Sequence, residues 1–334
     1  MKPKSVLVLG ATGAMARYMI PFLAENGCQV DGVALDKAES LYPNVKYFQG
    51  NAKDLPLLRE FLPRRYDAIV DFLTYRTSEI PYYLPLLLDH TGHYIYLSSG
   101  RVYDNLEKPV RETSPRLIDS SKDVLLLNSD DYCIYKARGE NLLFSRKRKN
   151  WTIGRPATTY SYLRYQLVTL EAADTVGRAF AGKKVAVPIQ AKDKPATLSW
   201  GGDAGKMIGK LLFCEAALGE VFNINSAENH TWGEIAGYYK DICGLDAVWI
   251  DKEDYLKIIN PDPYYLLSRW QLEYARLFDR EVDNSKVLAV TGMKQSDMMP
   301  LYDGLKMEIG RTPKDLPWPN NQRMDDYLAA MNLQ

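Results

Sequence analysis

Residues 5–16 are Ser5-Val-Leu-Val-Leu-Gly10-Ala-Thr-Gly13-Ala-Met-Ala16, an apolar run that ends in a glycine-rich turn. The run predicts a buried strand, and the residues after the turn predict a helix over 14–26. Gly10 and Gly13 let the backbone approach a bound group closely, and the N-terminus of the helix would face its phosphates. This order of strand, turn and helix predicts a dinucleotide-binding site, and the alternative is a plain strand-to-helix turn.

Short apolar runs alternate with helical stretches through the first half of the chain. We predict strands at 5–10, 29–35, 46–49, 67–72 and 93–98, with helices at 14–26, 54–62 and 79–90 between them. Later strands are expected at 151–155 and 220–224. The alternation indicates right-handed βαβ units and a parallel sheet. The predicted fold class is therefore α/β, with a doubly wound Rossmann sheet.

The length of 334 residues exceeds the usual single domain of about 100–200 residues, which predicts a second lobe. We expect a Rossmann domain at 1–160 with later returns near 199–226. A smaller, discontinuous substrate-binding lobe is expected at 161–198 and 227–334, and most of the remaining helical pattern lies at 161–183 and 227–334. Two such lobes usually enclose a cleft, so a small-molecule site is expected between them.

Composition argues against several function classes. Lys plus Arg balance Asp plus Glu at 42 each, so no overall field attracts nucleic acid or an anionic membrane. The four cysteines form no CxxC pair, and His90 and His93 have no third ligand cluster, so neither a metal site nor a disulfide framework is predicted. The N-terminal apolar run is too short to span a bilayer and lacks a cleavage-site pattern. A reducing cytoplasm is the expected location.

The predicted second strand ends on Asp36, where a carboxylate can accept hydrogen bonds from the hydroxyls of an adenosine ribose. This position favours NAD as the cofactor. Lys37 could instead bind a 2′-phosphate, which leaves NADP possible, and the alternative to both is a turn that faces solvent. Asn51 and Ala52 follow the third strand and are candidates for contact with the adenine edge.

Tyr132 and Lys136 lie four residues apart in a predicted helix that Ser129 or Asp130 would cap, and they therefore share one face of it. A free tyrosine has a pKa of about 10, but a nearby ammonium and an oxidised nicotinamide both favour its phenolate. A usable acid and base at neutral pH would result. The alternative is an ordinary aromatic residue and a solvated lysine, because a chain with 23 tyrosines often contains this spacing by chance.

The stretch Tyr94-Ile-Tyr-Leu-Ser98-Ser99-Gly-Arg-Val-Tyr103 is an apolar strand that ends in hydroxyls at the carboxyl edge of the sheet, where open α/β sheets bind ligands. Ser99 can there hydrogen-bond a reacting oxygen. The GxxGxxA loop, the SSxxVY strand end, the YxxxK helix and Arg155-Pro156 follow one another as in extended short-chain dehydrogenases. The chain resembles the NAD-dependent epimerase/dehydratase family well to about residue 160 and weakly as far as residue 226.

This resemblance implies an NAD(P)-dependent oxidoreductase that acts on a secondary alcohol or ketone of a nucleotide-linked sugar, as an epimerase or a ketoreductase. It implies catalytic roles for Ser99, Tyr132 and Lys136. The expected cofactor contacts are Gly10, Thr12, Gly13, Ala14, Met15, Asp36, Asn51, Ala52, Phe72, Leu73, Tyr132, Lys136 and Pro156. The expected substrate contacts are Tyr75, Ser99, Gly100, Arg101, Thr158 and Arg276.

The predicted helix 79–90 is apolar nearly all round, so it should be covered by more than the sheet. In the family that the chain resembles, this helix and the Tyr132 helix form a dimer interface, so a homodimer is expected. The alternative is burial against the second lobe of the same chain. Two other functions stay open: a non-catalytic or RNA-binding regulator on the same fold, and a reductase of a non-sugar carbonyl substrate. Such regulators commonly lose the tyrosine or the lysine, and both are present here.

Two departures from the family pattern bear on the reaction. Dehydratases of the family carry Asp-Glu after the catalytic hydroxyl, where this chain has Gly100-Arg101. Glycine has no side chain and arginine stays protonated, so this pair cannot supply the base and the acid that elimination of water requires. Glu112 or Asp119 could fold back and replace them. Thr158 stands where an asparagine often contacts substrate. We therefore predict that the protein does not catalyse a 4,6-dehydration.

Overall fold

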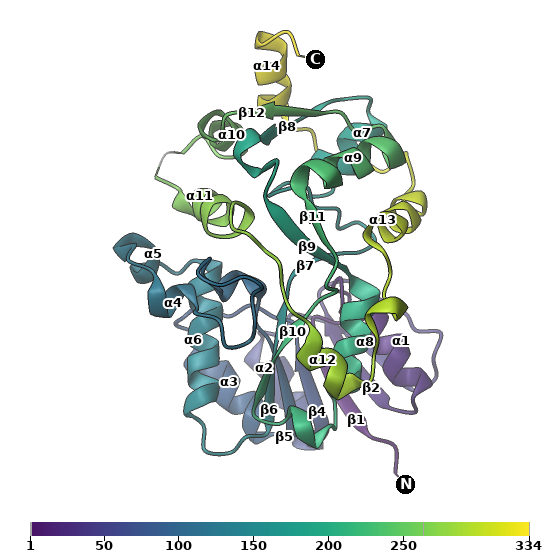
Figure 1. The fold of residues 1–334 in the computed structure, drawn as a ribbon. Coiled ribbons are helices and arrows are strands. Elements are labelled where there is room, and N and C mark those ends of the chain that lie inside the picture. Colours follow the sequence, from purple (N-terminus) through teal and green to yellow (C-terminus); the bar gives the residue numbers. More distant parts are fainter. Residues whose placement is uncertain (1, 263, 334) are drawn as a thin grey trace.

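The computed structural model describes residues 2–262 and 264–333. The strands of its large sheet are β1 (Ser5–Leu9), β2 (Gln29–Ala34), β3 (Val45–Gln49), β4 (Tyr66–Asp71), β5 (Thr91–Leu97), β6 (Trp151–Pro156) and β10 (Glu220–Ile224). These strands form one parallel sheet in the order β10-β6-β5-β4-β1-β2-β3 (Figure 1). Val6 of β1 is level with Val30 of β2 and with Ala68 of β4. The predicted Rossmann sheet is confirmed.

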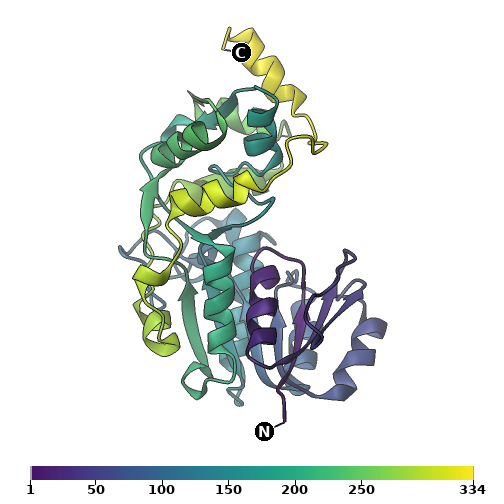
Figure 2. The same ribbon diagram turned by 90° about the vertical axis from the view of Figure 1, so that its right-hand side faces the viewer.

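Helices cover both faces of this sheet (Figures 1 and 2). One face carries α1 (Ala16–Glu25), α8 (Gly201–Leu211) and α12 (Ser285–Thr291), and the other carries α2 (Leu55–Phe61), α3 (Ile80–Asp89) and α6 (Tyr132–Ser145). Along β1 the side chains alternate between two cores. Val6 and Val8 pack with α1 and α8, whereas Leu7 and Leu9 pack with α2 and α3. Burial on both faces explains why β1 is a continuous apolar run.

The turn between β1 and α1 is longer than the sequence predicts, so the helix begins later. Gly10 has a φ of 82°, which residues with side chains rarely adopt, and a Cβ added there would stand 3.2 Å from Cβ of Phe72. The N–H of Gly13 donates to the carbonyl oxygen of Gly10 at 3.1 Å, so the chain turns before it becomes helical. Regular helix therefore begins at Ala16 instead of residue 14.

Later segments return to the sheet. Helix α8 and strand β10 lie within the expected return near 199–226, and a Cβ added to Gly205 of α8 would stand 2.7 Å from the carbonyl oxygen of Met15. A second return follows at 285–298, within the range that the sequence assigned to the second lobe. Helix α12 packs there on α8 and β10. The segment is too short for its apolar residues to indicate which half of the molecule they cover.

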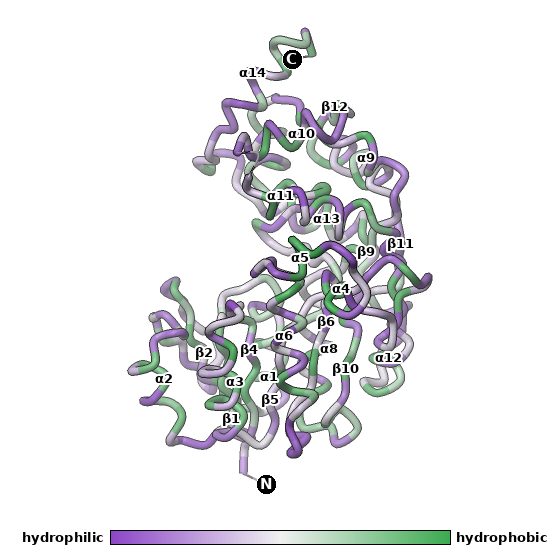
Figure 3. Tube along the Cα trace, turned by 90° about the vertical axis from the view of Figure 1, so that its left-hand side faces the viewer, coloured by the Kyte–Doolittle hydropathy of each residue, from purple (hydrophilic) through white to green (hydrophobic). Residues whose placement is uncertain are grey.

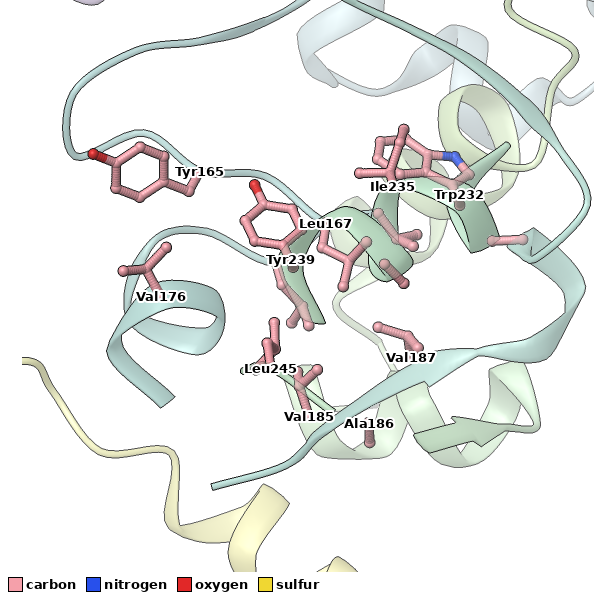
Figure 4. Close-up of a cluster of buried hydrophobic side chains, with 14 of the residues drawn as sticks. Tyr165, Leu167, Val176, Val185, Ala186, Val187, Trp232, Ile235, Tyr239 and Leu245 are labelled. Carbon is pink, nitrogen blue, oxygen red and sulfur yellow. The ribbon is translucent and has the colours of Figure 1, made fainter. Parts of the chain in front are cut away.

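The second lobe stands beyond the carboxyl edge of the sheet (Figure 1). Its strands form a three-stranded sheet of β11 (Asn229–Thr231), β9 (Pro195–Trp200) and β7 (Thr158–Tyr160), and a parallel pair of β12 (Ala247–Ile250) and β8 (Val185–Pro188). Its helices are α9 (Trp232–Cys243), α10 (Lys252–Ile259), α11 (Leu266–Gln271), α13 (Leu301–Gly310) and α14 (Gln322–Ala330). Tyr165, Leu167, Trp232 and Tyr239 belong to the core of this lobe (Figure 4).

The segment 161–183 is mostly irregular, contrary to the helical pattern of its sequence. It contains a π-helical turn at Ala173–Gly177 and the short α7 (Arg178–Phe180). Leu163 and Val168 have φ values of 62° and 55°, which a continuous helix does not allow. The apolar residues of the segment are buried all the same, because the irregular chain packs into the core of the second lobe.

Two short helices, α4 (Leu117–Ser120) and α5 (Val124–Asn128), connect β5 to α6 on the side of the second lobe. The hydroxyl of Tyr274 in the second lobe donates to Asp123 at 2.8 Å. Figure 3 shows α5 as a hydrophobic segment, and Leu125 on it is 67% exposed.

On α3, Tyr82 is 71% exposed, so the second lobe leaves this side of the helix uncovered. In the described chain, no helix has both the length and the apolar character that a membrane crossing requires.

Candidate active site

A pocket of about 250 Å³ lies between the carboxyl edge of the sheet and the second lobe. Ser99 follows β5, Tyr132 begins α6 and Pro156 ends β6, so the ends of three elements meet there. Of the expected substrate contacts, the pocket brings together Ser99, Gly100, Arg101, Thr158 and Arg276. Because the strands are parallel, Ser99 lies at their common carboxyl edge, as the sequence predicts.

The two serines at the end of β5 have different surroundings. Ser98 donates its hydroxyl to Glu140 at 2.5 Å inside the protein. Ser99 lines the pocket, and its hydroxyl oxygen accepts a hydrogen bond from the N–H of Arg101 at 3.1 Å. That contact caps a single turn of helix at Gly100–Val102. Ser99 is therefore the serine that can reach a ligand.

Tyr132 is the first residue of α6, and the helix cap fixes its position. The cap is Asp131, one residue after the expected Ser129 or Asp130, and its carboxylate accepts from the N–H of Cys133 at 2.9 Å. Burial raises the pKa of Tyr132, while a hydrogen bond from Ser99 and the charge of Arg101 oppose that rise. A positive charge or a hydrogen-bond donor at the phenol oxygen favours the phenolate. Tyr132 is thus placed to exchange a proton within the pocket.

Lys136 is buried beneath Tyr132, with 1% of its surface exposed. Its ammonium nitrogen donates to the carbonyl oxygens of Leu97 at 2.6 Å and Leu73 at 2.9 Å, and it lies 5.9 Å from the centroid of the Tyr132 ring. Burial lowers the pKa of Lys136 to about 8. These contacts place a positive charge between the ends of β4 and β5, next to the phenol.

A buried ion pair joins the strands and the helix that carry the site residues. Glu140 of α6 is fully buried and accepts two hydrogen bonds from Arg155 of β6, at 2.7 and 2.8 Å. Arg116 donates a third at 2.9 Å. Together with the bond from Ser98, these contacts join β5, α6 and β6. Arg155 therefore supports the site from behind and does not line the pocket.

The loop after β1 carries free hydrogen-bond donors where phosphates are expected. Within residues 2–262 and 264–333, the N–H groups of Thr12, Ala14 and Met15 have no acceptor. The hydroxyl of Thr12 donates to Asp36 at 3.1 Å and holds this exposed carboxylate beside the loop. Unpaired N–H groups at a helix start attract anions. The residues at this end of the sheet thus fit the pyrophosphate and ribose of a dinucleotide.

The other expected cofactor contacts lie at the same edge. Phe72 and Leu73 follow β4, and the N–H of Phe72 donates to the carbonyl oxygen of Leu9 at 3.0 Å. Asn51 is exposed and accepts from the N–H of Lys53 at 3.0 Å, whereas the neighbouring Ala52 is buried. The loops after β4 and β1 are therefore neighbours at this edge, and the loop after β3 lies on the far side of β2.

Tyr75 does not line the pocket, although it was expected to contact substrate. Its side chain is fully buried and stacks on Tyr83, with ring centroids 4.9 Å apart. The ammonium of Lys53 lies 5.4 Å from its ring centroid. The chain turns Tyr75 inward because the apolar face of α3 offers it a packing site, which periodicity in a loop cannot indicate. We leave Tyr75 out of the proposed site.

Glu112 and Asp119 could replace the two acidic residues of a dehydratase, but both bind other groups of the protein. Glu112 accepts from the N–H of Asn223 at 2.9 Å, and Asp119 pairs with Arg116 at 2.7 Å. Neither residue lines the pocket. The geometry therefore supports the prediction that elimination of water lacks its acid and base here.

The second lobe contributes three arginines to the pocket: Arg164, Arg276 and Arg280. Arg276 donates to the carbonyl oxygen of Val168 at 2.7 Å and to Thr158 at 2.9 Å. Arg280 donates to the carbonyl oxygen of Tyr103 at 2.8 Å. In the described part of the chain none of the three pairs with a carboxylate. Burial lowers the pKa values of Arg276 and Arg280 to about 10, so both stay charged at neutral pH.

From the sequence, the possible diphosphate partners in the second lobe were Lys192, Lys194, Arg269, Arg276 and Arg280, and Arg164 was not among the expected contacts. Arg164 lies on irregular chain, and Arg280 follows the π-helical turn Leu272–Arg276, so neither belongs to a pattern that marks a face. Arg269, another candidate from the same region, points to Glu253 at 2.5 Å and lies outside the pocket.

No protein-family model and no curated protein matches the sequence. Solved structures do match the fold. An epimerase from Methanothermobacter thermautotrophicus is 14% identical, covers 99% of this chain and 94% of its own, and has a TM-score of 0.66. UDP-glucose 4-epimerase from Thermotoga maritima is 18% identical, with coverage of 92% and 97% and a TM-score of 0.66. UDP-glucuronic acid 4-epimerase from Bacillus cereus is 16% identical, with coverage of 92% and 98% and a TM-score of 0.64. The chain therefore shares its fold with these structures over 92% to 99% of its length.

Proposed function

We propose that this protein is an NAD-dependent oxidoreductase that acts on a secondary alcohol or ketone of a nucleotide-linked sugar, as an epimerase or a ketoreductase. The observation that carries the proposal is one pocket in which Ser99 and Tyr132 meet Arg164, Arg276 and Arg280 of the second lobe. Similar folds solved with UDP-glucose, or with UDP-glucuronic acid and NAD, support the two ligand classes.

The loop after β1 would hold the pyrophosphate of NAD through the free N–H groups of Thr12, Ala14 and Met15. Asp36 would accept hydrogen bonds from the adenosine ribose. Glu39 lies 3.7 Å from the ammonium of Lys37 and competes for its charge, while Asp36 would repel a 2′-phosphate. NAD is therefore preferred to NADP, which titration with both cofactors tests.

The residues of the pocket would divide the proton chemistry among them. NAD, when bound, would supply hydride transfer at the sugar carbon. Tyr132, as the phenolate, removes the hydroxyl proton of the same carbon and later gives it back. Ser99 hydrogen-bonds the reacting oxygen and holds it near the phenol. Lys136, fixed by two carbonyl oxygens, keeps a positive charge beside Tyr132 and favours its charged form.

The arginines of the second lobe would bind the diphosphate of the substrate. A guanidinium matches phosphate oxygens through paired N–H donors, and a partly buried arginine without a carboxylate partner is costly unless an anion binds it. Arg276 and Arg280 are anchored to backbone carbonyl oxygens, so they are held in place before the ligand arrives. The nucleotide would then extend along the second lobe while the sugar lies over Tyr132.

A homodimer remains part of this proposal. Tyr82 of α3 is 71% exposed and Phe144 of α6 is 40% exposed on the outer side of the Rossmann half. A second copy that covers these helices would bury both aromatic side chains. Light scattering of the purified protein tests the state, and Tyr82→Asp should weaken a dimer that uses this surface.

The function is tested by identifying any dinucleotide that denatured protein releases and by supplying nucleotide hexoses with and without added NAD. Tightly held NAD with interconversion of two epimers would identify an epimerase. An empty site, with turnover only when cofactor is added, would identify a reductase. A protein that binds neither NAD nor any nucleotide sugar would disprove the proposal and favour a binding role for the fold.

A further inference from the structure

Asp71 is a fully buried carboxylate at the end of β4, next to the backbone that holds Lys136. Its two oxygens accept hydrogen bonds from the hydroxyl of Tyr94 at 2.7 Å and from the N–H of Leu73 at 2.9 Å. The carbonyl oxygen of the same Leu73 accepts a hydrogen bond from the ammonium of Lys136 at 2.9 Å. Leu73 therefore connects the carboxylate to the ammonium, with one hydrogen bond on each side of its Cα.

The other charged groups near Lys136 have partners of their own. Glu140, one turn further along α6, pairs with two arginines. Lys53, in the loop after β3, pairs with Glu79 at 2.9 Å. By contrast, the hydrogen-bond partners of Asp71 and of Lys136 in the described chain are all neutral. Asp71 and Lys136 are thus left as the counter-charges of each other.

The tyrosines around these two groups do not supply another charge. Tyr94 and Tyr75 lie next to Asp71, and the ring centroid of Tyr96 lies 5.0 Å from the ammonium of Lys136. Burial raises the pKa of each of these tyrosines well above its usual value. All three are therefore neutral at physiological pH, and the charge of Lys136 is balanced by Asp71.

We propose that Asp71 is a positioning residue, which acts as the buried counter-charge of the Lys136 ammonium and fixes the carbonyl oxygen that holds it. This inference rests on the proposed function, in which the charge of Lys136 favours the phenolate of Tyr132. Asp71 does not line the pocket, so it acts through Lys136 and not on the substrate. A buried charge without a counter-charge is costly, so Lys136 without Asp71 would lose its proton at a lower pH.

A different role for Asp71 would be to hold the turn after β4 and nothing more. Burial raises the pKa of Asp71, and a neutral, protonated acid could also hold the turn. Asparagine resembles that neutral acid in shape and lacks the charge of the carboxylate. Asp71→Asn therefore separates the two roles, because it affects Lys136 only if Asp71 carries a charge.

The first test is a double-mutant cycle on the free energy of unfolding, measured with urea for Asp71→Asn, Lys136→Met and the double variant. Each single variant leaves one buried charge without its partner, whereas the double variant removes both. The double variant should therefore lose less stability than the sum of the two single losses. Asp67→Asn is the matched control, because this carboxylate lies near the start of the same strand and accepts from the N–H of Ser5 at 2.8 Å. Its effect should add to that of Lys136→Met.

The second test measures kcat/KM for alcohol oxidation against pH, with NAD and a nucleotide hexose that the wild type oxidises. Burial lowers the pKa of Lys136 to about 8, and the charge of Asp71 opposes this lowering. Asp71→Asn should therefore move the basic limb of the profile to lower pH by about one unit or more, as expected for loss of a nearby opposite charge. Asp67→Asn should leave the limb in place.

An additive cycle, or a basic limb that Asp71→Asn leaves in place, would overturn the role of Asp71 while turnover by the wild type upheld the proposed function. If the wild type oxidises no nucleotide hexose, the proposed function fails, and the cycle still decides whether Asp71 balances Lys136, because unfolding needs no ligand. If Asp71→Asn does not fold, Lys136→Met should restore folding in the double variant, and failure to restore it would overturn the pairing.

Discussion

Ser99 and Tyr132 stand on one side of the pocket, at the ends of regular elements that the buried Glu140 joins together. Arg164 and Arg276 stand on the other side, on irregular or π-helical chain. The first side is held by contacts that leave little freedom, whereas the second side keeps guanidinium donors that the protein does not use. The difference indicates that one side fixes the chemistry and the other fixes the ligand. Changes on the first side should alter turnover, and changes on the second should alter affinity.

The largest effect is expected from Glu140→Ala, which removes the anion behind the chemical side. Arg155 would then be left with a buried charge and without its carboxylate, whereas Arg116 would keep its pair with Asp119. Loss of one member of a buried pair typically costs about 3–5 kcal/mol of the free energy of unfolding. Urea unfolding followed by circular dichroism measures the loss. Glu60→Ala on the exposed side of α2 is the matched control and should change little. An unfolding midpoint equal to that of the wild type would show that the frame does not depend on this ion pair.

Tyr132→Phe should come next, with turnover lowered by about 100-fold or more, because the proton-transfer oxygen alone is removed. Binding of NAD should stay nearly intact, and fluorescence titration checks it. Tyr135→Phe serves as the control, because it removes a phenol from the same helix at a residue outside the pocket. Activity retained in Tyr132→Phe would mean that another group carries the proton.

The chemical side of the pocket could be predicted because its parts lie at predictable places. An apolar run places Ser99 at the carboxyl edge of a parallel sheet, and a four-residue spacing places Tyr132 and Lys136 on one helix face. The frame behind them could not be predicted. Glu140 and Arg155 have no local pattern, and they meet only because α6 packs beside β6.

The resemblance named Thr158 and Arg276 of the ligand side, but the contacts that position them could not be predicted, for a related reason. Arg276 reaches Thr158 across 118 positions of the sequence, and no regular element connects the two. Leu163 and Val168 adopt positive φ values, so the helical spacing of 161–183 does not describe the path that brings Arg164 to the pocket. Sequence spacing predicts contacts within one element. The contacts of Arg164 and Arg276 depend on tertiary packing instead.

Arg276→Gln tests the ligand side and should weaken binding of UDP by about 10-fold to 100-fold, as expected for loss of a charged hydrogen bond of about 1.5–3 kcal/mol. Turnover at saturating substrate should fall much less than in Tyr132→Phe. Arg269→Gln is the matched control, because this arginine lies in the same lobe but pairs with Glu253 outside the pocket. A drop in turnover without a change in affinity would place Arg276 on the chemical side and remove the contrast between the two sides.

The smallest effect is expected in the pH dependence of Arg101→Gln, where the two sides of the pocket meet. Burial raises the pKa of Tyr132, and the hydrogen bond from Ser99 and the charges of Arg101, Arg164 and Arg276 oppose that rise. Lys136 adds a positive charge from within α6. Removal of one cation among several therefore raises the pKa of Tyr132 further, and the phenolate forms only at higher pH.

For alcohol oxidation, the acidic limb of the plot of kcat/KM against pH should move to higher pH in Arg101→Gln. It should stay near its original position in Arg101→Lys, which keeps the charge. The shift should be modest because the remaining cations still act on the phenol. A shift to lower pH, or an equal shift in both variants, would show that Arg101 acts on Tyr132 through its shape and not through its charge.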